Sequence, residues 1–115
     1  MQLPKHAQLL RIFIGEDDRH DGKPLYEVIV LKAREMHIAG ATVLRGGLGF
    51  GHSSRLHSSK ILRLSGDLPL VIEIVDNPER ISAFLPVLEG MMGESSGLVT
   101  LENVQVLQYG TGSVS

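Results

Sequence analysis

The chain has 115 residues, of which 43% are hydrophobic and 21% charged, with a formal net charge of −2 and no cysteine. This length predicts a single domain over residues 1–115, with enough apolar residues for a core of its own. Having no cysteine excludes disulfides, thiolate catalysis and cysteine zinc sites, and fits a reducing compartment. The slightly acidic balance argues against nucleic-acid binding, which needs an extended basic surface.

The N-terminal stretch MQLPKHAQLLRIFIG does not have the pattern of a signal peptide. Lys5, His6 and Arg11 interrupt its apolar residues, and no small-residue cleavage site follows. No apolar run in the chain approaches the length of a membrane span. We therefore expect a cytoplasmic protein with no direct membrane insertion.

Strands and helices alternate along the first part of the chain. Residues 8–14 (QLLRIFI) predict a first strand. Pro24 suits the first turn of a helix, the following apolar residues recur at helical spacing, and Gly40 is expected just past its end. Residues 41–44 then predict a second strand.

The second part of the chain repeats this alternation. Residues 70–75 (LVIEIV) predict a third strand, and Asn77 and Pro78 are typical residues to begin a helix, within which Pro86 should cause a kink. Residues 97–108 predict a fourth strand, with Glu102-Asn103 as a candidate break, and residues 110–115 are expected to fray. The order βαββαβ predicts an α+β, ferredoxin-like fold, with a four-stranded antiparallel sheet and both helices on one face.

The face of this sheet that carries no helix is predicted to be unusually apolar. In the first strand Leu9 and Phe13 flank Arg11, and in the third strand Val71 and Val75 flank Glu73. A sheet face exposed to water normally carries polar residues at these alternate positions. We therefore expect a homo-oligomer in which these faces meet.

The stretch between the second and third strands, about residues 46–68, is rich in glycine and basic residues. No carboxylate occurs between Glu35 and Asp67. Glycines can turn backbone N–H groups toward an anion, and positive charge favours a phosphate or a carboxylate as the ligand. A solvated surface loop is the alternative interpretation. The candidate ligand-binding residues are Arg45, Gly46, Gly47, Gly49, Phe50, Gly51, His52 and Arg55.

Catalysis and metal binding have weaker support in the same stretch. Serines lie near His52 and His57, but no strained strand-to-helix turn presents a nucleophile, and no acid lies nearby in sequence to orient a histidine. The spacing of five between the two histidines does not place two ligands on one face of a helix or a strand. We therefore expect no enzyme, no metal site and no resident cofactor.

Several strings resemble the nitrogen-regulatory PII superfamily. They are REMHIAGATV at a helix-to-strand junction, the GFG at residues 49–51, LPLVIEIV and GLVTLENVQVL. The strings LRIFIGE, GKPLYEVIVLKAREM, AGATVLRG and LPLVIEIVD resemble, more specifically, domain-of-unknown-function family 190, and this likeness covers roughly residues 3 to 109. It implies a PII-like homotrimer with a regulatory, effector-binding role.

PII proteins bind adenine nucleotides between subunits, and their loop contacts a partner protein. Three of their phosphate-binding cations correspond here to Leu70, Leu98 and Tyr109, which removes much of the charge that a triphosphate requires. The resemblance therefore implies a small anionic effector, such as an adenine nucleotide with few phosphates, and signalling to a membrane transporter or another protein. An alternative on the same fold is a metal-associated or structural trimer of the CutA type that does not bind nucleotide.

Overall fold

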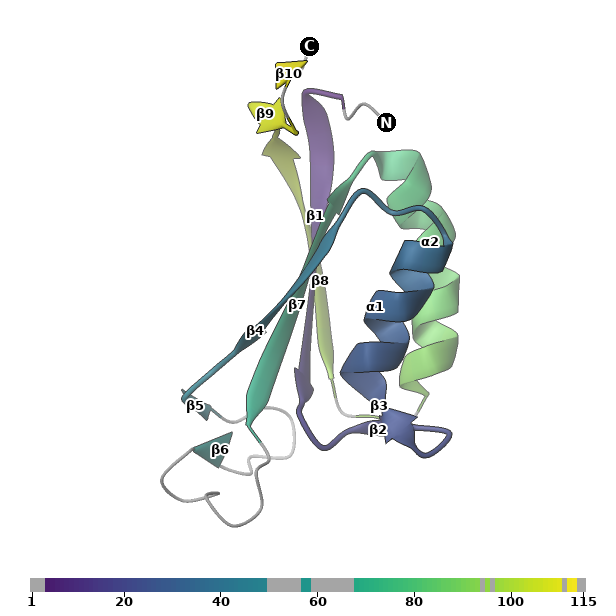
Figure 1. Ribbon diagram of the computed structural model, residues 1–115, viewed down its shortest axis with the longest axis vertical. Coiled ribbons are helices and arrows are strands. Elements are labelled where there is room, and N and C mark those ends of the chain that lie inside the picture. Colours follow the sequence, from purple (N-terminus) through teal and green to yellow (C-terminus); the bar gives the residue numbers. More distant parts are fainter. Residues whose placement is uncertain are drawn as a thin grey trace.

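The computed structural model describes residues 4–49, 57–58, 68–93, 95, 97–110 and 112–113 (Figure 1). Four long strands form one antiparallel sheet in the order β4-β7-β1-β8, and both helices cover the same face of it. This is the expected ferredoxin-like α+β fold. The elements are β1 (His6–Gly15), β2 (Arg19–His20), β3 (Lys23–Pro24), α1 (Leu25–Glu35), β4 (Ala41–Arg45), β5 (Leu48–Gly49), β6 (His57–Ser58), β7 (Pro69–Asp76), α2 (Pro78–Met92), β8 (Leu98–Gln105), β9 (Gln108–Tyr109) and β10 (Gly112–Ser113).

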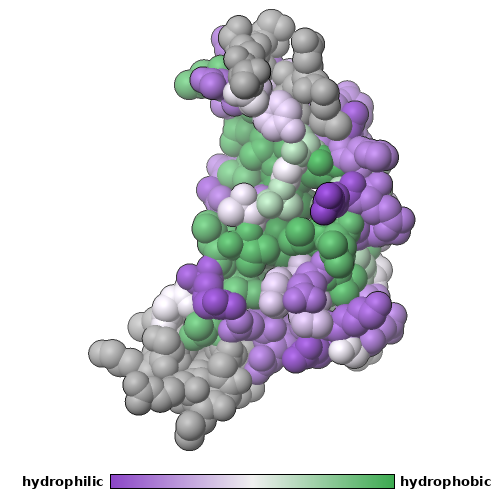
Figure 2. Space-filling view, viewed as in Figure 1, coloured by the Kyte–Doolittle hydropathy of each residue, from purple (hydrophilic) through white to green (hydrophobic). Residues whose placement is uncertain are grey.

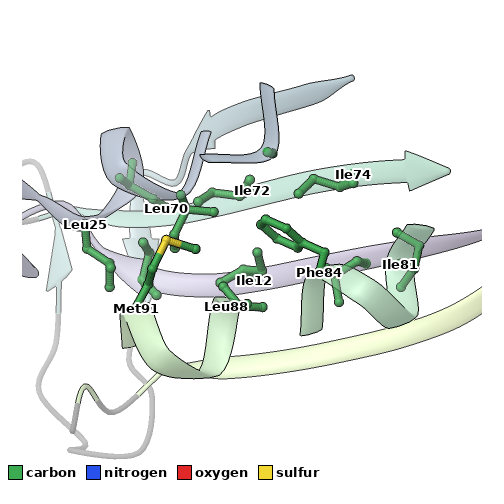
Figure 3. Packing of buried hydrophobic residues seen from close by; sticks show 13 residues of the cluster. Ile12, Leu25, Leu70, Ile72, Ile74, Ile81, Phe84, Leu88 and Met91 are labelled. Carbon is green, nitrogen blue, oxygen red and sulfur yellow. The ribbon is translucent and has the colours of Figure 1, made fainter. Parts of the chain in front are cut away.

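The core lies between the sheet and the two helices (Figure 3). Alternate residues of the two central strands β1 and β7 point toward the helices, and Ile12 lies directly opposite Ile72 in their ladder. Each such side chain contributes roughly 1.5–3 kcal/mol by leaving water. The buried residues of the core are Leu10, Ile12, Ile14, Leu25, Ile29, Ala33, Leu70, Ile72, Ile74, Ile81, Phe84, Leu88 and Met91.

The opposite face of the sheet, called here the open face, has no helix over it (Figure 1). It carries Leu9, Arg11 and Phe13 of β1 and Val71, Glu73 and Val75 of β7, all half-buried in the single chain. The edge strands extend its apolar area, because Leu44 pairs with Val71 and Leu98 pairs with Phe13. The apolar second face predicted from the two central strands is therefore confirmed.

Gly40 does not end helix α1, contrary to the sequence-based expectation. The residue in the left-handed conformation is His37, with a φ of 61°. Its N–H donates to the carbonyl of Arg34 at 3.1 Å, and the N–H of Ile38 donates to the carbonyl of Ala33 at 3.0 Å. This is a Schellman motif, in which the apolar residue after the left-handed one packs back on the helix. Ile38 packs against the core, so the turn comes at His37 even though that residue is not glycine.

Two further features differ from the sequence-based expectation. Strand β8 shows no break at Glu102-Asn103, because both residues remain paired with β1. The chain also contains a small hairpin, β2–β3, whose two turn residues Asp21 and Gly22 both have positive φ, at 52° and 78°. An Asp-Gly pair is a strong signal for this kind of turn, and the sequence analysis did not use it.

The helix starts agree more closely with expectation. Asn77 caps α2 by accepting a hydrogen bond from the N–H of Arg80 at 2.8 Å, and Pro78 is the first helical residue. Pro24 immediately precedes α1. In the C-terminal tail, β10 pairs with β9. Neither α1 nor α2 has the length and apolar content of a membrane-spanning helix.

Candidate functional site

The 46–68 segment leaves and rejoins the sheet at one end, where β4 and β1 finish and β7 begins (Figure 1). The N–H of Gly46 donates to the carbonyl of Pro69 at 2.7 Å, and the N–H of Glu16 donates to the carbonyl of Leu68 at 2.8 Å. The start of β7 is therefore held from both sides. We call residues 15–18, 45–49 and 68–69 the loop base.

Arg45 is the cation of the loop base. It is the last residue of β4, its side chain is 56% exposed, and its guanidinium forms an ion pair with the carboxylate of Glu16. Glu16 follows β1 and is only 21% exposed. Since β7 lies between β4 and β1, this ion pair spans three strand ends. Glu16 could not be identified from the sequence, because the pairing depends on the order of strands in the sheet.

Of Gly46, Gly47 and Gly49, two lie close to the ring of Pro69. Gly46, Gly47 and Gly49 do not adopt left-handed φ values, and the N–H of Gly46 is already bonded to Pro69. A Cβ on Gly46 would lie 3.0 Å from Cγ of Pro69, and one on Gly49 would lie 3.5 Å from the same atom. A side chain at position 46 would therefore need the proline ring to shift by a few tenths of an ångström. That the N–H groups of Gly47 and Gly49 hold an anion stays a prediction.

The other candidate residues are only partly described. Gly49 of β5 pairs with His57 of β6, which brings the two sides of the 46–68 segment together at the last residue of the loop base. Around Gly47, no atom of the described residues other than its chain neighbours lies within 4 Å of the position a Cβ would take. The remaining four candidates, Phe50, Gly51, His52 and Arg55, lie outside the described residues.

The three positions that correspond to PII cations carry no charge and have different surroundings. Leu70 is a core residue, 2% exposed, whereas Leu98 on the open face is 57% exposed. The hydroxyl of Tyr109 donates a hydrogen bond to the carbonyl of Ala39 at 2.8 Å, which ties the C-terminal region to the α1–β4 connection. Among these three residues, none can neutralise a phosphate.

The acidic turn next to Arg45 is built by its own hydrogen bonds. The carboxylate of Asp18 accepts from the N–H of Gly15 at 2.9 Å, and its carbonyl accepts from the N–H of Leu25 at 2.8 Å. Asp18 therefore fixes the path from β1 to α1. Within the described part of the chain, no three histidine, aspartate or glutamate residues are grouped so that they could hold a metal ion.

A shallow groove of about 260 Å³ lies between α1 and β4. Figure 2, which has the same view as Figure 1, shows a largely apolar surface in this region. Leu31 on its rim is 62% exposed and Val43 is 37% exposed. The groove has no cation in its lining, so it does not suit an anion. Its lining residues are Tyr26, Glu27, Val30, Leu31 and Val43.

Comparison with known proteins gives three kinds of similarity. Residues 7–106 match the family model DUF190, described as "Uncharacterized ACR". A UPF0166 protein of Aquifex aeolicus is 41% identical over 100 residues, covering 87% of this chain and 92% of its own. UPF0166 protein MJ1524 of Methanocaldococcus jannaschii is 34% identical over 100 residues, covering 87% and 91% of the two chains.

Among solved structures, the fold is similar to that of CPII, a nitrogen regulatory PII-like protein from Thiomonas intermedia K12 bound to ADP, AMP and bicarbonate. The TM-score is 0.69 over 88% of each chain, with 16% sequence identity. At this identity the similarity concerns the fold alone. The family match covers most of the chain, and the relatives agree with it over nearly the same span. The chain therefore belongs to domain-of-unknown-function family 190, and it has a PII-like fold.

Proposed function

We propose that this protein is a PII-like cytoplasmic regulator that binds a small anionic effector at the loop base. The effector we favour is an adenine nucleotide with few phosphates. The 46–68 segment then contacts a partner protein, such as a membrane transporter, and this contact depends on whether the effector is bound. Arg45 carries the proposal, because it places an exposed guanidinium at the point where the glycine-rich segment leaves the sheet.

The chemistry of the loop base supports an anion with one or two phosphates. A guanidinium binds phosphate or carboxylate oxygens through two parallel N–H donors. The neutral residues Leu70, Leu98 and Tyr109 stand where PII proteins have further cations, so a third phosphate would gain little. The related fold of CPII, which holds ADP and AMP, is consistent with a ligand of this class.

Assembly into a homotrimer is the second part of the proposal, and it would place the effector between subunits. The open face carries the apolar residues Leu9, Phe13, Val71 and Val75 without a covering helix, and Leu44 on its edge is 49% exposed. A surface of this kind is stabilised when a partner removes it from water. We propose that the open faces of three copies meet around a central axis.

The proposed role is binding, with no bond-breaking step. Arg45 and the open position at Gly47 offer groups that hold an anion, but neither is a nucleophile or a general base. The residues that suggested a serine–histidine pair, His52 and the serines near it, lie outside the described residues. We therefore favour effector binding over catalysis for the described site, because catalysis would need a nucleophile or a general base in addition to these groups.

Calorimetry on the whole chain tests the effector. We expect both AMP and ADP to bind. ATP should bind at most about tenfold more tightly than AMP, because the third phosphate would find no additional cation at positions 70, 98 and 109. Arg45→Gln should weaken AMP binding by about ten- to a hundredfold, since a charge-assisted hydrogen bond contributes roughly 1.5–3 kcal/mol. Arg34→Gln is the control, because it removes the same charge from the last turn of α1, away from the loop base.

Three outcomes would contradict the proposal. ATP binding far more tightly than AMP would mean that the phosphates lie elsewhere. Equal loss of binding in Arg34→Gln and Arg45→Gln would show an effect of overall charge. A chain that binds no nucleotide, and that divalent metal ions stabilise in a thermal-shift screen, would support the metal-associated CutA-type alternative.

A further inference from the structure

We propose that Glu16 is the internal counter-ion of Arg45 and that the anionic effector binds by replacing it. This inference rests on the proposed function, and it assigns to Glu16 the role of a positioning residue. The two residues are 29 positions apart in the chain and meet only because β1 and β4 finish at the same end of the sheet.

The two partners of this ion pair are held with different firmness. The backbone of Glu16 is fixed by its N–H bond to Leu68, and the preceding residue, Gly15, is fixed by its N–H bond to Asp18. The side chain of Glu16 is only 21% exposed, whereas that of Arg45 is 56% exposed at the end of an edge strand. The arginine side chain is also longer, with more rotatable bonds. The guanidinium is therefore the partner that can turn away from the pair.

A carboxylate and a phosphate bind a guanidinium through the same donors. The side chain has five N–H groups in a fixed fork and no acceptor, and both kinds of anion occupy that fork in a bidentate manner. Two anions on one guanidinium also repel each other. Glu16 is bonded to Nη2 of Arg45, so an effector phosphate that takes both Nη1 and Nη2 must displace Glu16 from Nη2.

This competition connects binding to the 46–68 segment. The ion pair joins the end of β4 to the residue after β1, across the start of β7, where the segment rejoins the sheet. When the pair opens, the backbone bonds to Leu68 and Pro69 and the hydrogen bonds of Asp18 remain, but the side-chain link between the end of β4 and the residue after β1 is lost. Effector binding would thus loosen the point at which the segment is anchored. A neutral ligand, which cannot replace a carboxylate, would leave the anchor closed.

A double-mutant cycle on the full chain tests the competition, with AMP and inorganic phosphate as the titrants. We expect Glu16→Gln to bind AMP about two- to fivefold more tightly than the native protein, the range given by an exposed ion pair. In the Arg45→Gln background the same change should have no effect. Asp21→Asn is the control, because Asp21 is an exposed carboxylate in the same connection and asparagine tolerates its left-handed backbone.

Each result decides the matter. Unchanged or weaker binding by Glu16→Gln overturns the inference, and so does an equal gain in Asp21→Asn or in the Arg45→Gln background, since either would mean general charge repulsion. If native protein and Glu16→Gln both fail to bind, the inference and the proposed function both fall. If only Glu16→Gln binds, the inference stands and the proposed function fails for these ligands.

Folding of the variants is checked by thermal unfolding before titration. If Glu16→Gln does not fold, Glu16→Asp provides the second test. Its carboxylate is one methylene shorter, so it keeps the charge but loses contact with Arg45. A gain in AMP affinity smaller than twofold but above that of Asp21→Asn is then expected, and no gain overturns the inference.

Discussion

Arg11 of β1 donates a hydrogen bond from Nε to a carboxylate oxygen of Glu73 at 3.0 Å. Glu73 lies directly opposite Arg11, on the neighbouring strand β7. A second nitrogen of the same guanidinium donates to Glu102 of β8. The hydrogen bond to Glu73, with the negative charge of Glu102, raises the pKa of Arg11 above its ordinary value. This cluster lies on the open face, between the apolar residues Leu9 and Phe13 of the same strand.

The cluster predicts a stability effect that depends on salt. Arg11→Gln leaves Glu73 and Glu102, on the two strands that flank β1, without the cation between them. The melting temperature should therefore fall, and it should fall more at low salt than at high salt. Arg11→Gln combined with Glu73→Gln should recover part of the loss. Thermal unfolding at two salt concentrations measures this. Equal losses at both salt concentrations would mean that packing of the arginine stem causes the effect.

The same cluster should be insensitive to mildly alkaline pH. A raised pKa in the folded state contributes stability that is present below the unfolded-state pKa and lost only as the pH rises through the folded-state pKa. For arginine both values lie above the range in which proteins are normally handled. The contribution of Arg11 should therefore stay constant between neutral and mildly alkaline pH.

Assembly through the open face can be tested at residues that cost the single chain little. Leu44 is 49% exposed, so Leu44→Asp should leave the fold intact but dissociate a trimer that buries this face, because an unpaired buried carboxylate is unfavourable. Leu31→Asp is the matched control, since Leu31 is 62% exposed on α1, on the side of the groove. Light scattering gives the mass. Dissociation by Leu31→Asp and not by Leu44→Asp would assign the interface to the groove instead.

The choice of residue matters for this experiment. Val71 is half-buried on the open face, whereas the neighbouring Ile72 is fully buried in the core. Val71→Asp therefore also tests assembly, but Ile72→Asp would place a carboxylate among core side chains and unfold the domain. A stable monomer of the native chain at micromolar concentration would contradict the proposed trimer.

Asp76 is a buried acidic residue that joins the α1–β4 connection to the β7–α2 connection. Its two carboxylate oxygens accept hydrogen bonds from the N–H of Ala39 at 2.9 Å and the N–H of Asn77 at 2.7 Å. Asp76→Ala leaves both N–H groups without a partner, and each such group costs roughly 1–3 kcal/mol. Chemical denaturation should therefore show that the free energy of unfolding falls by about 2–5 kcal/mol. This range is the cost of two such groups, with the upper end reduced because the surrounding backbone can relax.

Asp76→Asn is the graded control for this prediction. The amide has one acceptor oxygen, so it can satisfy one of the two N–H groups and should lose about half as much stability. Asn77→Ala, which removes only the cap of α2, should cost about 1 kcal/mol. If Asp76→Ala cost no more than Asn77→Ala, the two hydrogen bonds would not hold the connections together.

The left-handed residue after α1 predicts a stabilising substitution. His37→Gly should stabilise the chain by up to about 1 kcal/mol, because a non-glycine residue is strained by roughly this amount at positive φ. Gly40→Ala is the companion test, since Gly40 is not left-handed and, in the described part of the chain, only its chain neighbours lie within 4 Å of the added Cβ. It should be neutral or stabilising by about 0.4–1 kcal/mol. The opposite result, with Gly40→Ala destabilising and His37→Gly neutral, would place the helix-ending turn at Gly40.

Local features of the sequence predicted most of the secondary structure. The alternation of Leu10, Ile12 and Ile14 with Leu9, Arg11 and Phe13 identified both faces of β1, because side chains in a strand point to opposite sides. Asn77 with Pro78 located the start of α2, because capping involves only neighbouring residues. The order of these elements was enough to predict the fold.

The contacts of the loop base were decided by the tertiary structure. Arg45 and the glycines were recognised as a candidate anion site from composition, but the ion pair with Glu16 requires β7 to lie between β4 and β1. The role of Gly46 likewise depends on Pro69, which the sheet brings to within 3.0 Å of its missing Cβ. Local pattern determines which residues form a strand or a helix, and which distant residues meet depends on how those elements pair, because hydrogen bonds and ion pairs act only at short range in space.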